Sequence, residues 1–248
     1  MTMRRPTKDG PHPRVVGVIM SQTDLDLATR MRERPDLFEL RLDHLVGPAA
    51  AGLEELEEKI SRLRVPLIIT ARHPQEGGAN KLNLRQRREL LSRFLPHARY
   101  IDIELRSAAA LRPLRKLARK KNVRRIISFH DLKATPVLDR LQVKARRAKS
   151  LGADIFKVAT RTDTPAQLAR LLDFITKKDL DLAVSAMGIG KLGAISRVLL
   201  AYRGSALIYG SVAAATEIEG QVSLEQLRTF GIGRWEHRTC FLCVARKK

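Results

Sequence analysis

The feature that most constrains the fold is a set of eight short, apolar, β-like runs that recur along the chain. Their midpoints lie roughly 22 to 34 residues apart, and most are nearly continuous in apolar residues. Parallel strands that are covered on both faces have this composition. The runs are RVVGVIM (14–20), LFELRL (37–42), VPLIITA (65–71), RYIDIEL (99–105), VRRIISF (123–129), ADIFKVA (153–159), LDLAVSA (180–186) and SALIYGS (205–211).

The segments between these runs have helical periodicity. Residues 50–63 and 139–152 repeat apolar side chains at steps of three and four, and residues 162–178 open with Thr and Pro, as helices often do. Eight strands that alternate with helices predict an α/β protein of the (β/α)8 TIM-barrel class. A doubly wound open sheet is the alternative, but it usually has fewer strands and a glycine-rich first turn, which VIMSQTDL is not.

The chain of 248 residues has a length that suits one α/β barrel, and no linker interrupts it. We expect a flexible basic segment over 1–13, a catalytic barrel domain over 14–232 and a basic tail over 233–248. No run approaches the roughly 20 apolar residues that a membrane span requires. The N-terminal segment lacks the apolar stretch of a secretory signal, so we expect a cytoplasmic protein without a membrane anchor.

The composition is strongly basic, with 47 Lys and Arg against 26 Asp and Glu and a formal charge of +21. These charges are spread over presumed outer helix faces and lack the interleaved aromatic residues of a stacking platform. We therefore expect nucleic acid to bind only nonspecifically, at low salt. Cys240 and Cys243 form a lone CxxC, which falls short of the four ligands of a structural zinc site, so we interpret them as incidental reduced thiols.

Charged and polar side chains occur where most of these runs end. In a barrel the carboxyl ends of all the strands meet at one face, where active sites of this fold are built. So many polar exceptions at one face indicate a functional site. The residues concerned are Glu39, Arg41, Arg72, Glu76, Glu104, His130, Asp131, Lys157, Arg197 and Gln221.

Lys157 is the least expected of them, because it interrupts the apolar run ADIFKVA. Burial disfavours the charged form of a lysine, and a neutral amine can attack a carbonyl carbon to form a Schiff base. The alternative is a structural ion pair with Asp102 or Glu104. We favour the nucleophile and expect Lys157→Ala to leave the fold intact.

His130 closes the fifth run, in the predicted layout next to Lys157. Its imidazole could remove a proton and later protonate a leaving group, although a buried structural histidine is the alternative. Glu76, in the loop RHPQEGG, could orient the imidazole and stabilise its cation.

Three arginines, Arg41, Arg72 and Arg197, predict a cationic pocket, because the guanidinium group binds carboxylates through two parallel hydrogen bonds. Glu39 points to the same side of its strand as Arg41 and could orient an arginine or accept hydroxyl hydrogen bonds. Outer salt bridges remain the alternative for each arginine. The residues together predict a small polyhydroxylated oxo acid as substrate.

These segments, in this order, resemble the type I 3-dehydroquinate dehydratases from about residue 14 to residue 227. The matching pieces are FELRLDHL, TARHPQEGG, YIDIEL, IISFHDL, FKVAT, GKLGAISR, the GS of YGS and the GQ at 220–221. The resemblance implies a (β/α)8 barrel, usually dimeric, that needs no metal and no organic cofactor. It also implies a hydro-lyase of the shikimate pathway, which makes aromatic amino-acid precursors by dehydrating 3-dehydroquinate to 3-dehydroshikimate.

By the same resemblance, Lys157 matches the Schiff-base lysine and His130 the general acid/base that takes the C2 proton and assists departure of the C1 hydroxide. Glu76 matches the carboxylate that orients the histidine. The positions matching substrate-binding residues are Glu39, Arg41, Arg72, Arg197 and Gln221.

The lid segment departs from the family pattern. Relatives usually read ASAPGQ where this chain reads ATEIEGQ, so Glu217 stands in place of a serine and Glu219 in place of the proline. A carboxylate facing a substrate carboxylate is repulsive. One alternative is therefore a dehydratase-like paralogue with altered substrate or lost activity, and another, of a different class, is a basic non-catalytic binding protein on the same barrel.

Overall fold

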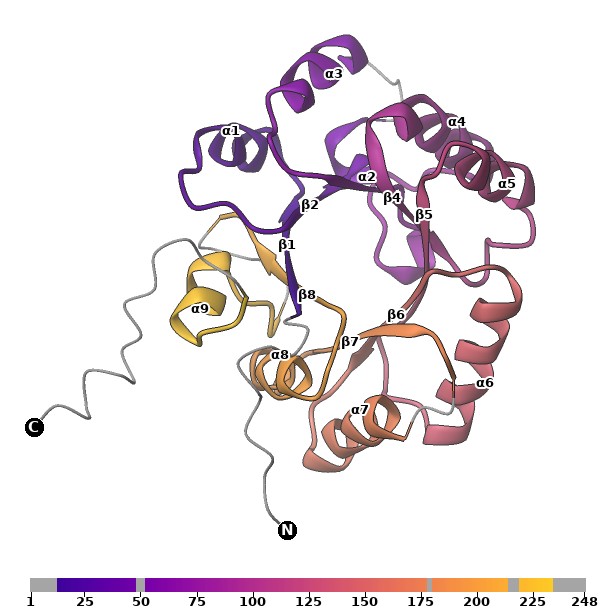
Figure 1. The fold of residues 1–248 in the computed structure, drawn as a ribbon, viewed down its shortest axis with the longest axis vertical. Coiled ribbons are helices and arrows are strands. Elements are labelled where there is room, and N and C mark those ends of the chain that lie inside the picture. The colour runs from indigo at the N-terminus through magenta and orange to yellow at the C-terminus, as the bar shows by residue number, and fades with distance from the viewer. Residues whose placement is uncertain (1–12, 48–51, 178–179, 214–218, 234–248) are drawn as a thin grey trace, which may run out of the picture.

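The computed structural model describes residues 13–47, 52–177, 180–213 and 219–233. Seen down its short axis, it is a ring of helices around a central set of strands (Figure 1). The expected N-terminal segment and C-terminal tail lie almost wholly outside the described residues, as do Glu217, Cys240 and Cys243. None of the helices that are described is both long and apolar enough to cross a lipid bilayer.

Strands and helices alternate along the chain, as the sequence predicts. The strands are β1 (Arg14–Ile19), β2 (Leu37–Arg41), β3 (Leu67–Thr70), β4 (Ala98–Glu104), β5 (Arg124–Asp131), β6 (Ile155–Arg161), β7 (Ala183–Ile189) and β8 (Leu207–Ser211). The helices are α1 (Gln22–Arg30), α2 (Leu42–Leu45), α3 (Leu53–Ser61), α4 (Leu84–Phe94), α5 (Arg112–Lys120), α6 (Leu138–Ser150), α7 (Pro165–Thr176), α8 (Gly193–Tyr202) and α9 (Leu224–Thr229), with 3₁₀ turns η1 (Pro74–Glu76) and η2 (Leu95–His97).

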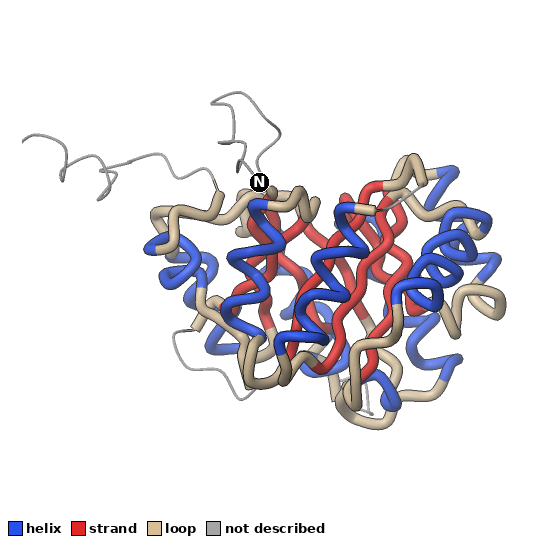
Figure 2. The backbone as a smooth tube through the Cα atoms, turned by 90° about the horizontal axis from the view of Figure 1, so that it is seen from below, coloured by secondary structure: helices blue, strands red, loops and turns tan. Residues whose placement is uncertain are grey.

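The strands form one parallel sheet in the order β7-β6-β5-β4-β3-β2-β1-β8. The two end strands then approach each other and close the ring. Ala206 N–H donates to the carbonyl of Val184 at 2.8 Å, and the Ser185 hydroxyl donates to the carbonyl of Leu207 at 2.8 Å. The side view shows the strands enclosed by helices (Figure 2). The prediction of a (β/α)8 barrel is confirmed, and the open doubly wound sheet is excluded.

The inside of the barrel changes from apolar to charged along the strands. Alternate residues of a strand share a face, so the inward positions of β4 read Tyr100, Asp102 and Glu104. The first of these belongs to an apolar inner cluster with Val16 and Ile68, among others. The charged positions follow it toward the carboxyl ends of the strands, which places the polar side chains at one mouth of the barrel.

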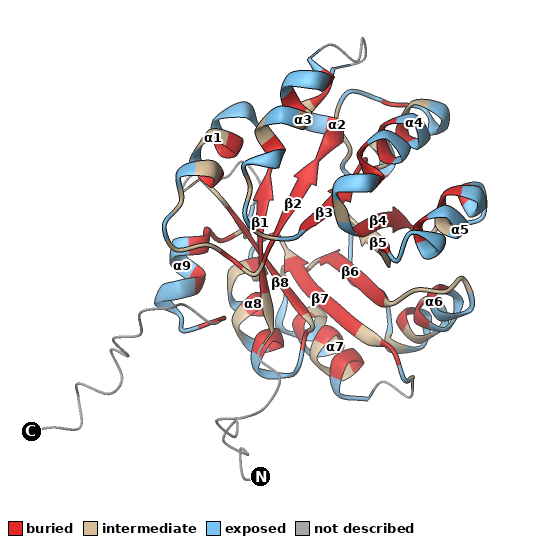
Figure 3. Ribbon diagram, turned by 45° about the horizontal axis from the view of Figure 1, so that its top comes forward, coloured by how far each residue is buried: buried red, intermediate tan, exposed pale blue. Residues whose placement is uncertain are grey.

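The helices begin where the sequence predicts and turn their charged faces outward. Thr164 caps α7 by accepting the backbone N–H of Gln167, whose side chain reaches back to Thr164, and Pro165 occupies the first helical position. The strands are buried while the outer helix faces are exposed (Figure 3). On α5, for example, Lys116 and Arg119 are exposed, so the basic composition lies on a solvated surface.

Glycines from two of the segments that resemble the family, GKLGAISR and the GQ at 220–221, meet at the mouth of the barrel. Gly220 has φ of +75°, and a Cβ at this position would lie 2.1 Å from the carbonyl oxygen of Gly190 and 2.8 Å from the Cα of Gly193. A side chain at Gly220 would therefore combine left-handed backbone strain with a backbone clash. The loop after β8 can lie against the start of α8 only because both contacting segments carry glycine.

We expect Gly220→Ala to destabilise the chain much more than Gly204→Ala. Gly204 also has a positive φ, of +90°, but a Cβ there would meet no atom within 4 Å. The control should cost about 1 kcal/mol of unfolding free energy through strain alone. Gly220→Ala should cost roughly 1–3 kcal/mol more because of the clash. Urea denaturation of both variants measures this difference, and equal losses would contradict the close approach.

Candidate active site

The predicted site residues converge at the carboxyl-terminal mouth of the barrel. Glu39 and Arg41 come from β2, Arg72 and Glu76 from the segment after β3, His130 from β5 and Lys157 from β6, and most of them are buried. Arg197 lies in the first half of α8, and Gln221 follows β8. The structure therefore brings together side chains that are far apart in the sequence, such as Lys157 and Glu39, which are 118 residues apart and in direct contact.

Lys157 is only 3% exposed and is surrounded by compensating groups. Its ε-amino group donates to Glu39 Oε1 at 3.1 Å and to Asp102 Oδ2 at 3.0 Å. The nitrogen also lies 4.0 Å from the centroid of the Tyr209 ring, a cation–π contact. The ion pair with Asp102, one of the alternatives that the sequence leaves open, therefore exists in this structure together with the mouth position that a nucleophile requires.

This environment changes the expectation for Lys157→Ala. Removing one partner of a buried ion pair leaves an uncompensated charge and typically costs 3–5 kcal/mol. Among the described residues, the substitution would leave Arg72 as the one cation that pairs with Glu39 and Asp102. Lys157 thus contributes to folding as well as to the site.

Arg72 links three carboxylates from two strands, β2 and β4. Its guanidinium group binds Asp102 at 2.8 Å and Glu104 at 3.4 Å and approaches Glu39 at 3.7 Å. Burial alone lowers the pKa of Arg72, but Asp102 and Glu104 outweigh it and raise the pKa above its ordinary value. Burial likewise raises the pKa of Asp102, yet Arg72 and Lys157 hold it well below its usual range. Asp102 therefore stays ionised.

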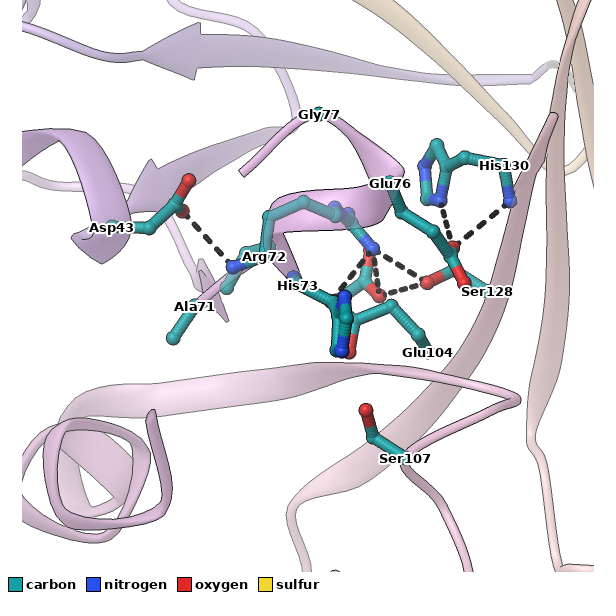
Figure 4. Close-up of polar contacts among 12 residues, drawn as sticks. Asp43, Ala71, Arg72, His73, Glu76, Gly77, Glu104, Ser107, Ser128 and His130 are labelled. Atoms are coloured by element: carbon teal, nitrogen blue, oxygen red, sulfur yellow. Dashed lines mark hydrogen bonds and ion pairs between the residues drawn. The ribbon is translucent and has the colours of Figure 1, made fainter. Parts of the chain in front are cut away.

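His130 and Glu76 form a second buried pair beside this cluster (Figure 4). Glu76 Oε2 accepts the backbone N–H of His130 and lies 3.0 Å from the imidazole Nδ1. Because Glu76 Oε2 acts as an acceptor, the imidazole of His130 takes the tautomer in which Nδ1 carries the proton and donates to this oxygen. Nε2 therefore carries the lone pair. Burial, with Arg72 and Lys157, lowers the pKa of His130 well below its ordinary value, so the ring is neutral and can accept a proton.

Glu76 is held in an environment that resists its ionisation. Burial and then the charge of Glu104 raise the pKa of Glu76 to about 7, against the lowering effect of Arg72. The carboxyl group of Glu76 therefore gains or loses its proton near neutral pH. Its interaction with the imidazole of His130 changes with this protonation state.

Arg41 is oriented by Asp43 rather than by Glu39. It donates from Nε and Nη2 to the two oxygens of Asp43, at 3.0 and 2.8 Å, and from Nη2 to the carbonyl of Gly77. Burial raises the pKa of Asp43, but Arg41 and the surrounding hydrogen bonds hold it below its ordinary value. Asp43 also accepts the backbone N–H groups of Arg72 and Ala79, so it ties the loop after β3 to the mouth.

Arg197 is buried without a carboxylate partner among the described residues. Its Nε donates to the carbonyl of Tyr209 at 3.0 Å, and its Nη1 donates to the carbonyls of Gly188, Gly193 and Gly220. Burial alone lowers its pKa to about 10, so the group remains a cation at neutral pH. Its Nη2 has no hydrogen bond to any residue that the structure describes, so this nitrogen can donate to an anion.

The lid segment is described only from Glu219 onward. Glu219 forms a 3.0 Å ion pair with Arg161 at the end of β6, and its carbonyl accepts the N–H of Gly190. Gln221 follows directly and is partly buried. The residue in place of the family's proline therefore fixes this end of the lid to two neighbouring strands, while Glu217 lies outside the described residues.

Three residues of the site could not be identified from the sequence pattern. Asp43 lies in the matching piece FELRLDHL, but nothing in its spacing shows that it orients Arg41. Arg87 is 1% exposed in α4, and its position among the four arginines of that helix hides its pairing with Glu104. Tyr209 continues an apolar run, yet its ring covers Lys157, and its buried hydroxyl has no hydrogen-bond partner among the described residues.

Comparisons with known proteins agree on one family. The type I 3-dehydroquinase family profile matches residues 16–230. The chain is 31% identical over 219 residues to a 3-dehydroquinate dehydratase of Thermodesulfovibrio yellowstonii, covering 87% of this chain and 92% of the relative. It is 34% identical over 194 residues to one of Methanothermobacter thermautotrophicus, covering 78% and 82%.

The solved structures give the same result. The 3-dehydroquinate dehydratase of Geobacillus kaustophilus superposes with a TM-score of 0.79 at 26% identity, covering 89% of this chain and 90% of the other. The type I enzyme of Clostridium difficile, solved with covalent modified comenic acid, gives 0.78 at 26% identity, covering 88% and 91%.

Fold and site together define a (β/α)8-barrel protein with a buried lysine and a histidine–glutamate pair at its carboxyl-terminal mouth. Within that class, the chain belongs to the type I 3-dehydroquinase family.

We expect the stability of the Glu76→Gln variant, relative to that of the wild type, to increase as the pH rises. The pKa of Glu76 is about 7 in the folded chain and near 4.5 in the unfolded one, so ionisation penalises the folded state between these values. Glutamine keeps an oxygen that accepts from His130 but cannot ionise. The unfolding free energy of the variant minus that of the wild type should rise by up to about 3 kcal/mol from pH 4.5 to pH 8.

Urea denaturation at a series of pH values measures this difference directly. A difference that stays constant across that range, or that falls with pH, would contradict the raised pKa of Glu76.

Proposed function

We propose that this chain is a 3-dehydroquinate dehydratase that converts 3-dehydroquinate to 3-dehydroshikimate and water through a Schiff base on Lys157. The curated relatives that match most of its length bear that enzyme's name. The observation that carries the mechanism is the buried amine of Lys157, on the strand next to His130, in a mouth that also holds cationic arginines. The reaction belongs to the shikimate pathway and to aromatic amino-acid biosynthesis.

The first chemical step joins Lys157 to the C3 ketone of the substrate. The ammonium group gives up a proton, and the neutral amine attacks the carbonyl carbon. The C–O bond then breaks with release of water, and the nitrogen is left in a protonated imine. An ammonium and a ketone thus give an iminium and water, so the positive charge between Glu39 and Asp102 is conserved.

The second step removes the C2 proton. The iminium withdraws electrons and acidifies this C–H bond, and neutral His130 accepts the proton at Nε2 because Glu76 holds Nδ1. The resulting enamine expels the C1 hydroxyl, which takes the proton from His130 and leaves as water. Hydrolysis of the imine releases the product and restores the amine.

Anion binding completes the site. Arg197 is buried and lacks a carboxylate partner among the described residues, so its Nη2 is suited to the substrate carboxylate. Gln221 directly follows Gly220, whose carbonyl accepts a hydrogen bond from Arg197. Arg41 is pre-oriented by Asp43, while Arg72 acts chiefly by holding Asp102 and Glu104. One carboxylate oxygen of Glu39, Oε1, accepts hydrogen bonds from both Lys157 and Thr70. The proposed reaction uses no metal and no organic cofactor, and we propose that it takes place in the cytoplasm.

A dehydration assay tests the function. Incubation with 3-dehydroquinate should produce the enone absorbance of 3-dehydroshikimate in the wild type, and Lys157→Ala and His130→Ala should each lower kcat by at least about 100-fold. Because Lys157→Ala also breaks a buried ion pair, circular dichroism must show that the assayed variant is folded. A folded, pure wild type that produces no enone absorbance would overturn the proposal.

We also propose that the enzyme is a homodimer that associates through the outer face of α8. Ile195, Leu199 and Tyr202 are spaced along one helix face and are 50%, 36% and 61% exposed. The one charged residue of this helix, Arg197, is buried. Two copies of a chain with a charge of +21 repel each other, so contact is favoured at an apolar face without exposed charge.

Sedimentation of two lysine variants tests this interface. Leu199→Lys would place like charges against each other and should convert the dimer to a monomer. Leu117→Lys, on the already basic α5, starts from 37% exposure and should leave the dimer unchanged. Dimers that persist in Leu199→Lys, or a monomeric wild type, would contradict the assignment.

A further inference from the structure

A second concave site lies beside the residues that carry Glu76. This cavity has a volume of about 460 Å³, within the range of small-molecule sites. Its walls come from the turn η1, the residues leading into α4 and the connection between β4 and α5. We call it the η1 pocket and define it by residues 73–75, 81–84, 87, 106, 107 and 110.

The walls of the η1 pocket are cationic. Lys81, Arg87 and Arg106 all line it, and none of its lining residues is Asp or Glu. Lys81 and Arg106 form no ion pair with any carboxylate in the described part of the chain.

Both of these side chains are exposed to solvent. The positive charge that they bring to the pocket is therefore not neutralised within the described chain.

Arg87 gives the pocket a fixed, buried guanidinium group whose charge is balanced by Glu104. It is 1% exposed, and its Nε donates to the carbonyl of Ala71 at 2.8 Å while its Nη1 donates to the Ser107 hydroxyl at 3.2 Å. Its Nη2 pairs with Glu104, which lies outside the pocket lining. These contacts hold the guanidinium group in place without a carboxylate in the wall of the pocket.

The lowered pKa of His73 is consistent with a positive potential in the pocket. Burial lowers the pKa of His73, and the charges of Arg87 and Arg106 lower it further, with only Glu104 opposing them. The start of α4 faces the same space, and the N-terminus of a helix adds a partial positive charge. Lys81, Arg106 and the N-terminus of α4 thus direct positive charge into one small cavity.

We propose that the η1 pocket binds a small phosphate-bearing anion. A phosphate group carries close to two negative charges near neutral pH and offers several acceptor oxygens, which suits a pocket lined by Lys81, Arg106 and the N-terminus of α4. The occupant would lie against His73, whose backbone N–H donates to Glu104 at 2.8 Å and whose carbonyl accepts the N–H of Glu76 at 2.9 Å. The ligand would therefore contact the segment that positions the catalytic pair.

Calorimetric titration with inorganic phosphate tests the site, with chloride at matched ionic strength as the reference. The proteins are the wild type, the double variant Lys81→Gln/Arg106→Gln, and the control Lys116→Gln/Arg119→Gln on the exposed face of α5. Both double variants lose two positive charges, so the comparison removes the effect of net charge. Glycerol phosphate in parallel titrations distinguishes a phosphate ester from free phosphate as the preferred ligand.

We expect the wild type and the α5 control to bind phosphate alike, and the pocket variant to bind at least about tenfold more weakly. Equal binding by the two double variants would overturn the proposal, because it would place the anion at the barrel mouth or on the general surface. The titration contains no 3-dehydroquinate, so its outcome is independent of the proposed dehydratase activity.

Discussion

The charged interior of the barrel depends on one buried network of ion pairs. Glu39, Asp102 and Glu104 supply three carboxylates, and Lys157, Arg72 and Arg87 supply three cations. Because the two sets balance, the network can be buried without a net charge. Such a network adds little stability over an apolar core, but losing one member is costly. The network instead holds the nitrogen of Lys157 in a fixed position at the mouth of the barrel.

The same network sets the protonation states around it. Arg72 and Lys157 add to the effect of burial and keep His130 neutral, while Glu104 adds to the burial that raises the pKa of Glu76. The histidine can therefore accept a proton beside a cation. Conversion of an ammonium to an iminium leaves the charge of the network unchanged, so Schiff-base chemistry is compatible with its burial.

Much of the fold and part of the site could be predicted from the sequence. The apolar runs matched the eight strands, and the place of Lys157 late in β6 put it at the mouth. The partners could not be predicted, because they depend on the register between strands that are distant in the chain. Arg72 was expected to contact substrate but is engaged by Asp102 and Glu104, and Arg197 is held by four backbone carbonyls.

The most direct test of the central claim is borohydride reduction in the presence of 3-dehydroquinate, followed by mass mapping of the peptides. If Lys157 is the nucleophile, reduction should trap the substrate or product carbon skeleton on the peptide that contains Lys157, and should inactivate the enzyme in step. An unmodified Lys157 at saturating substrate, or a stable adduct on a different lysine, would contradict the account.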